Sequence, residues 1–152
     1  MSQQANDLVI RKSVTVSVPV ERAFQVFTEE ISTWWPLRTH AVDTERSDAV
    51  VMEGHVGGRL FEQTPENEEH VWGTIVAWDP PLHITYSWHP GRGEETAQQV
   101  DITFTPHTDG TRVDIAHYGW EKLTGPIEDT LASYHEGWDK VIGLYAEAAD
   151  RS

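Results

Sequence analysis

Apolar and polar residues alternate along residues 8–18. The even positions from 14 to 18 are all valine, and the odd positions from 13 to 17 are serine or threonine. A period of two places successive side chains on opposite faces of an extended chain. We therefore predict a β-strand over residues 8–18, with one apolar face.

Two short helices are predicted to follow. Pro19 suits the first position of a helix, where its missing N–H would have no partner. The next apolar residues recur at helical spacing, namely Val20, Ala23, Phe24 and Phe27. Residues 29–35 are predicted to form the second helix, which Pro36 ends.

Residues 37–48 are polar and irregular and predict a loop, whereas residues 49–118 predict an antiparallel meander. The predicted strands are 49–55, 59–63, 71–78, 83–88, 98–106 and 111–118. The last two are joined around Asp109-Gly110, a pair that tolerates the positive φ of a tight turn.

A long helix is predicted to open at Gly125-Pro126 and to run to about Ala149. Its apolar stripe consists of Ile127, Leu131, Tyr134, Trp138, Val141, Tyr145 and Ala148. At 1.5 Å per residue it is roughly 34 Å long, enough to cross a small sheet. Gly137 and Gly143 lie within it. They are either tolerated at a small cost or leave room for a cavity or a close approach of the sheet.

Composition narrows the class of protein. The 152 residues contain no cysteine and carry a formal net charge of −14. This charge disfavours binding to nucleic acid or to anionic membranes, and the absence of thiols excludes disulfides and thiolate metal sites. We expect a frayed segment over residues 1–7, one domain over residues 8–150, no membrane insertion and a cytoplasmic location.

The strand faces indicate which side chains meet the long helix. Each of three strands has an apolar face: 84, 86 and 88; 100, 102 and 104; 113, 115 and 117. His117 ends the third row and is either a satisfied core histidine or a polar group in a cavity. On strand 49–55, Glu53 and His55 share one face with Val51. That face points either into the core or toward solvent. The opposite face is more apolar, which favours the outward orientation for Glu53 and His55.

Eight histidines raise the question of a metal site. Residues 135–139 resemble a His-Glu-x-x-His zinc motif but lack its second histidine. The remaining candidate is a set of two histidines and one carboxylate brought together across strands, namely His55, Glu53 and His117. Scattered histidines are more often surface or hydrogen-bonded residues, and we expect no metal and no cofactor. No nucleophile elbow, phosphate loop or dinucleotide motif is present in the sequence.

Several segments in this order resemble START-like helix-grip domains of the SRPBCC superfamily. The similarity is strongest to the branch of the C-terminal domain of heat-shock chaperone ATPase activators. The matching segments are residues 18–24 (VPVERAF), 57–61 (GGRLF), 72–81 (WGTIVAWDPP), 110–113 (GTRV) and 137–138 (GW). The resemblance implies an α+β helix-grip fold, in which a curved antiparallel sheet wraps around the long C-terminal helix.

In that superfamily the space between the sheet and the helix holds lipids, polyketides, plant hormones or no known ligand, and a few members are cyclases or aromatases. We therefore expect a non-enzymatic binder of a small hydrophobic or aromatic ligand. The candidate ligand-binding residues are Trp34, Trp35, Trp72, Tyr86, Trp88, Phe104, His117, Trp120, Tyr134 and Trp138.

Two alternatives remain open. One is a cyclase-, aromatase- or hydrolase-like enzyme that uses His117 or the pair of Glu53 and His55 as acid–base groups. The other is a co-chaperone-type interaction module whose acidic surface binds a chaperone or another basic protein. A monomer and a homodimer are both compatible with the sequence.

Overall fold

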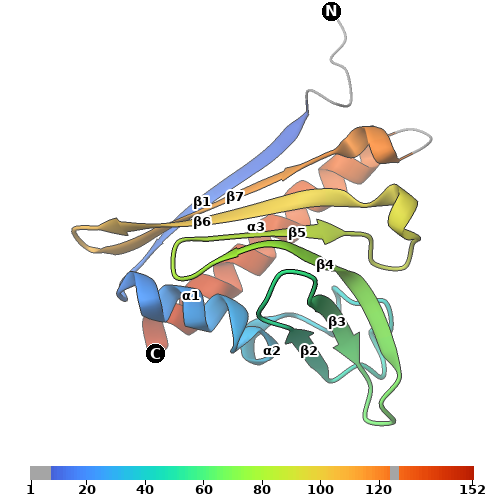
Figure 1. Ribbon diagram of the computed structural model, residues 1–152, viewed down its shortest axis with the longest axis horizontal. Coiled ribbons are helices and arrows are strands. Elements are labelled where there is room, and N and C mark those ends of the chain that lie inside the picture. The colour runs from blue at the N-terminus through green and yellow to red at the C-terminus, as the bar shows by residue number, and fades with distance from the viewer. Residues whose placement is uncertain (1–7, 124–126) are drawn as a thin grey trace, which may run out of the picture.

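The computed structural model describes residues 8–123 and 127–152. Seven antiparallel strands form one sheet in the order β1-β7-β6-β5-β4-β3-β2 (Figure 1). The strands are β1 (Val9–Val16), β2 (Ala49–Met52), β3 (Arg59–Gln63), β4 (Glu69–Asp79), β5 (His83–Trp88), β6 (Gln98–His107) and β7 (Gly110–Tyr118). The α-helices are α1 (Val20–Thr28), α2 (Ile31–Trp34) and α3 (Glu128–Arg151). Short 3₁₀ turns lie at Glu94–Thr96 and Trp120–Lys122.

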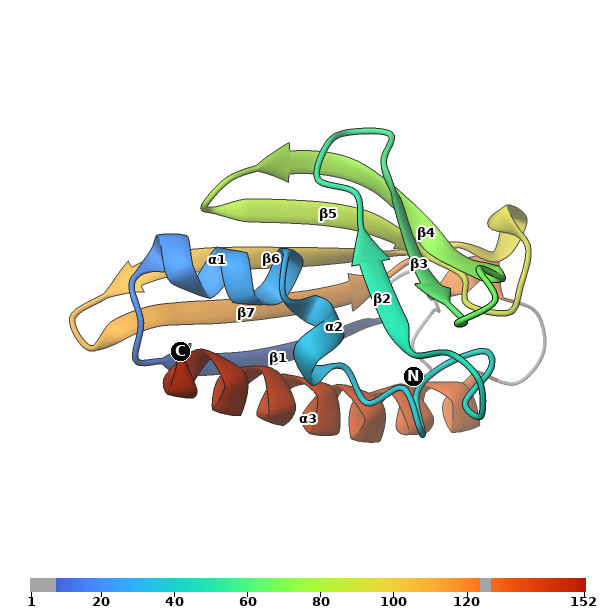
Figure 2. The ribbon, with the colours of Figure 1, turned by 90° about the horizontal axis from the view of Figure 1, so that it is seen from below.

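The sheet curls, and α3 lies against its concave side, alongside β1 (Figure 2). This is the helix-grip arrangement that the sequence predicts, with two short helices after the first strand. The observed α3 begins at Glu128 and ends at Arg151; the predicted start at Gly125-Pro126 lies outside the described residues. None of the helices within the described residues has the length and hydropathy needed to span a membrane.

The core lies between the sheet and α3. All three predicted apolar strand faces are buried, including Tyr86, Ile102 and Ile115. They pack with the buried face of α3, which contributes Trp138, Val141, Ile142, Tyr145 and Ala149. The period-two pattern therefore predicted the buried strand faces. The predicted helix stripe is confirmed at Trp138, Val141 and Tyr145, whereas Ala148 is only half-buried, and Ile142 and Ala149 are buried outside the predicted stripe.

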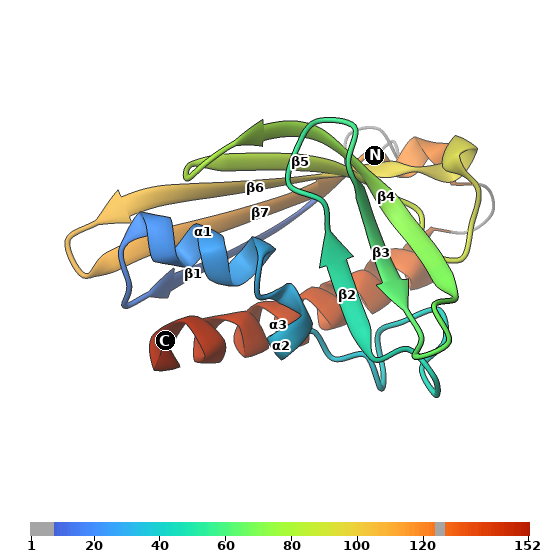
Figure 3. The same cartoon turned by 60° about the horizontal axis from the view of Figure 1, so that its bottom comes forward.

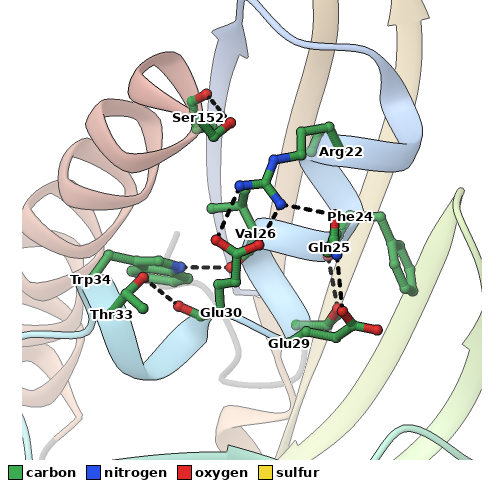
Figure 4. A network of polar contacts seen from close by, with 12 residues as sticks. Arg22, Phe24, Gln25, Val26, Glu29, Glu30, Thr33, Trp34 and Ser152 are labelled. Carbon is green, nitrogen blue, oxygen red and sulfur yellow. Dashed lines mark hydrogen bonds and ion pairs between the residues drawn. The ribbon is translucent and has the colours of Figure 1, made fainter.

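The first two helices form a compact corner. The Nε1–H of Trp34 donates to the carbonyl of Val26 over 2.8 Å, which fastens α2 to α1 (Figure 4). The Arg22 guanidinium pairs with the carboxylate of Glu30 on the outside of the same corner. The ring of Trp34 packs against Tyr145 of α3, with the ring centroids 5.4 Å apart. Trp34 is therefore a packing residue between the helices.

The predicted strand 49–55 is too long, because β2 ends at Met52. Beyond it the chain turns: Glu53 Oε1 accepts a hydrogen bond from the backbone N–H of Arg59 over 2.8 Å, and Gly57 adopts a φ of +88°. Glu53 also forms an ion pair with Arg59, and His55 is exposed. Of the two orientations left open, the inward one is wrong: Val50 is buried, and Glu53 and His55 lie outside the core.

Candidate ligand-binding site

A cavity of about 170 Å³ lies between the sheet and the N-terminal half of α3. Its walls come from β4, β5, α3, Trp35 at the end of α2, Pro90 after β5, and residues 36–48. We call residues 36–48, which lead to β2, the 36–48 loop. Figure 3 shows this loop passing beside α3. The lining residues are Trp35, His40, Ala41, Trp72, Trp88, Pro90, Tyr134, Gly137, Trp138 and Val141.

Four indoles form most of the apolar wall. The ring centroids of Trp35 and Trp72 are 5.0 Å apart, those of Trp72 and Trp88 are 5.5 Å apart, and those of Trp88 and Trp138 are 6.5 Å apart. All four side chains are buried. Contacts of this kind between aromatic rings hold each ring in place. The cavity is therefore bounded by large, flat side chains in fixed orientations.

Two polar side chains also line the cavity. The hydroxyl of Tyr134 accepts the Nε1–H of Trp88 over 3.2 Å, which leaves its own proton to be donated. Burial raises the pKa of Tyr134, so the phenol stays protonated at neutral pH. Burial, together with the charge of Lys140, lowers the pKa of His40, so its imidazole is neutral there. The cavity thus offers a hydroxyl donor and a neutral imidazole.

His40 is held by its neighbours on the 36–48 loop. Its Nδ1 lies 2.7 Å from the hydroxyl of Thr39, and its backbone carbonyl accepts the Nε1–H of Trp35 over 2.7 Å. Arg38 ties the rest of the loop together, because its guanidinium donates to three backbone carbonyls, those of Thr44, Glu45 and Ser47. The loop is therefore internally braced.

The buried carboxylate of Glu62 on β3 anchors this loop to the cavity wall. Its Oε1 accepts the N–H of Val42 over 2.6 Å and the Nε1–H of Trp72 over 2.7 Å. Its Oε2 accepts the N–H of Asp43 over 2.9 Å and the hydroxyl of Ser47 over 2.5 Å. Burial by itself would raise the pKa of Glu62, but these four hydrogen bonds outweigh it and hold the pKa below its usual range.

Sequence reasoning missed both Glu62 and His40. The position of Glu62 in β3 could have indicated that it is buried. It comes two residues after the buried Leu60 and therefore lies on the same face of the strand. A carboxylate on a core-facing position needs several donors. Three of those donors come from the 36–48 loop, 15 to 20 residues away in sequence, and the fourth is the indole of Trp72 on β4. No local pattern marks them.

His117 lies in the core behind the cavity, and both of its ring nitrogens have partners. Nδ1 accepts the Nε1–H of Trp138 over 3.0 Å, and Nε2 lies 3.2 Å from Oε1 of Gln98. Because Nδ1 must accept, Nε2 carries the proton and donates it to Gln98. The ring is fully buried and lies 4.3 Å, centroid to centroid, from Trp120. Burial lowers the pKa of His117 to about 3.

The structure brings five of the ten predicted ligand-binding residues to the cavity: Trp35, Trp72, Trp88, Tyr134 and Trp138. The other five lie in the packed core around it: Trp34, Tyr86, Phe104, His117 and Trp120. The one metal set that the sequence offered, His55, Glu53 and His117, which we did not expect to bind a metal, does not come together: His55 is exposed, and His117 is fully buried with both ring nitrogens bonded.

The two glycines of α3 differ in their surroundings. Gly137 lines the cavity, and a Cβ placed on it would lie 3.5 Å from Nε2 of His40. Gly143 is exposed, and a Cβ there would meet nothing within 4 Å. Of the two readings of these glycines, room for a cavity therefore describes Gly137 and simple tolerance describes Gly143.

Several solved structures are similar to this chain. Protein MLL2253 from Mesorhizobium loti is 16% identical, with a TM-score of 0.68, and the match covers 95% of this chain and 98% of that one. The Aha1 dimer from Colwellia psychrerythraea is 14% identical, with a TM-score of 0.70 and coverage of 94% and 96%. At these identities the likeness shows the fold alone.

A third structure is closer in sequence. Txn09, described as an anthrahydroquino-gamma-pyrone synthase, is 26% identical, with a TM-score of 0.60, and the match covers 95% of this chain and 99% of that one. Among curated proteins, none matches the chain significantly. The family model described as "Activator of Hsp90 ATPase homolog 1-like protein" matches residues 17–145. Since that span is most of the sequence, the chain belongs to the Activator of Hsp90 ATPase homolog 1-like family.

Proposed function

We propose that this protein binds a small aromatic molecule in the cavity between the sheet and α3. The observation that carries the proposal is the wall of four buried indoles around an open volume of about 170 Å³. An apolar cavity of about 150 Å³ is known to hold benzene, whereas sites for drug-sized ligands span about 300–1,000 Å³. A ligand of one or two rings fits this volume.

The polar groups indicate where the ligand carries its own polar atom. The free hydroxyl proton of Tyr134 favours a ligand oxygen that accepts, such as a carbonyl or a phenolic oxygen. The neutral ring of His40 offers a second partner at the 36–48 loop. Binding energy then comes mainly from burying the rings, at about 25 cal/mol per Å² of apolar surface, and the two polar groups set the orientation.

Phenol and 2-naphthol are the probes for this proposal, and isothermal titration calorimetry is the measurement. We expect both to bind and 2-anthrol, which adds a third ring, to bind at least tenfold more weakly than 2-naphthol. Gly137→Ala should weaken 2-naphthol binding about tenfold, because the new methyl group takes up space next to His40.

Gly143→Ala is the matched control. Both substitutions replace a helix glycine with alanine and should raise stability by about 0.5–1 kcal/mol, but only Gly137 lines the cavity. The control should keep the affinity for 2-naphthol. Equal affinities for the two variants, or no heat of binding with phenol or 2-naphthol, would rule out this cavity as the site.

An enzyme acting on a similar ligand is a second candidate, favoured by the 26% identity with the synthase Txn09. The acid–base groups would then be His40 and Tyr134, which line the cavity, rather than His117, which does not. Substitution of His40 with alanine would abolish turnover of a bound substrate while leaving the fold intact. Turnover that survives this substitution would exclude the role.

The family match favours a protein partner as a third candidate. The formal charge of −14 would make association with a basic chaperone surface weaken as salt rises. Homodimerisation is part of the same candidate, because a related structure is described as a dimer.

We place the protein in the cytoplasm, on the basis of its composition without cysteine.

A further inference from the structure

Three side chains with metal-binding atoms lie close together where the 36–48 loop meets the start of β4. Asp43 comes from the loop, Glu68 from the turn before β4, and His70 from β4 itself. One ligand atom of each lies within 4.8 Å of those of the other two. Among residues 8–123 and 127–152, no other group of three or more histidine or acidic residues comes this close together.

His70, itself one of the three, shows a second sign of an incomplete site. Its Nε2 is buried without a hydrogen-bond partner, and it is the only such side-chain nitrogen or oxygen atom among the described residues. A buried polar atom without a partner costs about 1–3 kcal/mol. His70 lies directly opposite Glu62 in the β3–β4 ladder, so its side chain is on the sheet face that the loop covers.

We propose that Asp43, Glu68 and His70 form a binding site for a divalent transition-metal ion of the zinc type. Imidazole and carboxylate together suit such an ion, with water as a fourth ligand. Metal–ligand bonds of 2.0–2.2 Å place tetrahedral ligand atoms about 3.4 Å apart. Ligand atoms that lie within 4.8 Å of one another therefore have to approach by up to about 1.4 Å, and the exposed side chain of Glu68 has room to move.

Arg46 occupies the same carboxylates when no ion is bound. Its guanidinium lies 3.1 Å from Glu68 and 3.9 Å from Asp43, and it is half-exposed. It also reaches Glu66, at 3.4 Å, so it can stay paired after leaving the other two. Arg46 therefore acts as a competitor of the ion, and its removal should strengthen metal binding.

The site would connect the loop to the sheet. Asp43 is already held through its backbone N–H by Glu62, which in turn accepts the indole N–H of Trp72 in the cavity wall. The same loop contributes His40 and Ala41 to the cavity. A bound ion fastens this loop at a second point, independently of whether the cavity holds a ligand.

Isothermal titration calorimetry with Zn²⁺ at pH 7.5 tests the proposal on the full chain. We expect one ion per chain. His70→Ala and Glu68→Gln should each weaken binding about tenfold or more, because each removes a ligand. Arg46→Gln should tighten binding several-fold. Excess Mg²⁺ or Ca²⁺ should not compete, since both prefer sites made of oxygen alone.

His135→Ala is the matched control, because His135 is an exposed histidine on α3 outside the group. It should bind Zn²⁺ as the unaltered protein does. Glu68→Gln keeps the test decisive if His70→Ala fails to fold, because Glu68 is exposed. Unchanged affinity in Glu68→Gln, or an equal loss in His135→Ala, would overturn the proposal and indicate scattered surface binding only.

Discussion

Between pH 6.5 and pH 4 the protein is expected to lose about 1.4 kcal/mol of unfolding free energy per pH unit through His117 alone. Burial lowers the pKa of this histidine to about 3 in the folded protein, whereas an unfolded chain titrates near 6.5. Between these values the unfolded chain binds a proton that the folded chain does not, so stability falls as the pH falls. At pH 4.5 the loss reaches about 3 kcal/mol.

The contacts of His117 explain why protonating its ring destabilises the folded protein. Trp138 donates its indole N–H to Nδ1 of His117, and a protonated ring has no lone pair there to accept it. Protonation would thus place one donor against another inside the core. The neutral ring is a fixed structural part of the wall behind the cavity.

His117→Gln tests this account. The glutamine amide can accept from Trp138 with its oxygen and donate to Gln98 with its nitrogen, but it does not ionise. Urea unfolding of the variant between pH 4.5 and pH 7.5 should therefore show a much flatter dependence on pH. His107→Gln is the matched control, because His107 is exposed and the slope should persist. A slope in His117→Gln as steep as in the unaltered protein would contradict the assignment.

The strands and the long helix could be predicted because apolar residues recur along each of them at a regular spacing. Rows such as Ile84, Tyr86 and Trp88 mark a buried strand face by themselves, and the stripe on α3 marks its partner. The cavity is harder to predict, because a filled core and a cavity wall have the same composition. Trp34 and Trp35 are neighbours in sequence, yet only Trp35 lines the cavity. The helix α2 ends at Trp34 and the backbone of Trp35 is extended, so the two rings stay in contact, with centroids 5.9 Å apart, but only that of Trp35 reaches the cavity.

The polar parts of the site depend on contacts between distant segments. Glu62 meets its donors on the 36–48 loop, and His40 meets Gly137 across the cavity, about a hundred residues apart. The spacing of residues in the sequence predicts which side chains share a face of one helix or strand, but it does not predict contacts between distant segments. This is why the walls could be predicted in part, whereas the histidine that lines the cavity and the carboxylate that holds the loop could not.

Glu62→Ala is expected to be one of the most destabilising single substitutions in the protein, at roughly 3–5 kcal/mol. It would leave four donors without their acceptor: the N–H groups of Val42 and Asp43, the hydroxyl of Ser47 and the indole of Trp72. Each buried donor without a partner costs about 1–3 kcal/mol, and water admitted by the loosened loop offsets part of the sum. Urea unfolding at pH 7.5, well above the titration of Glu62, measures the effect.

Two further variants separate the carboxylate from the loop itself. Glu62→Gln keeps the shape but brings an amide N–H₂ toward donors, so it should recover little of the lost stability. Glu45→Ala alters an exposed carboxylate on the same loop and should stay within about 0.5 kcal/mol of the unaltered protein. Because Glu62 positions the loop that carries His40, its loss should also weaken 2-naphthol binding, whereas Glu45→Ala should not. If Glu62→Gln kept full stability and full affinity for 2-naphthol, the shape of the side chain would be enough to anchor the loop. The negative charge of the carboxylate would then not be needed.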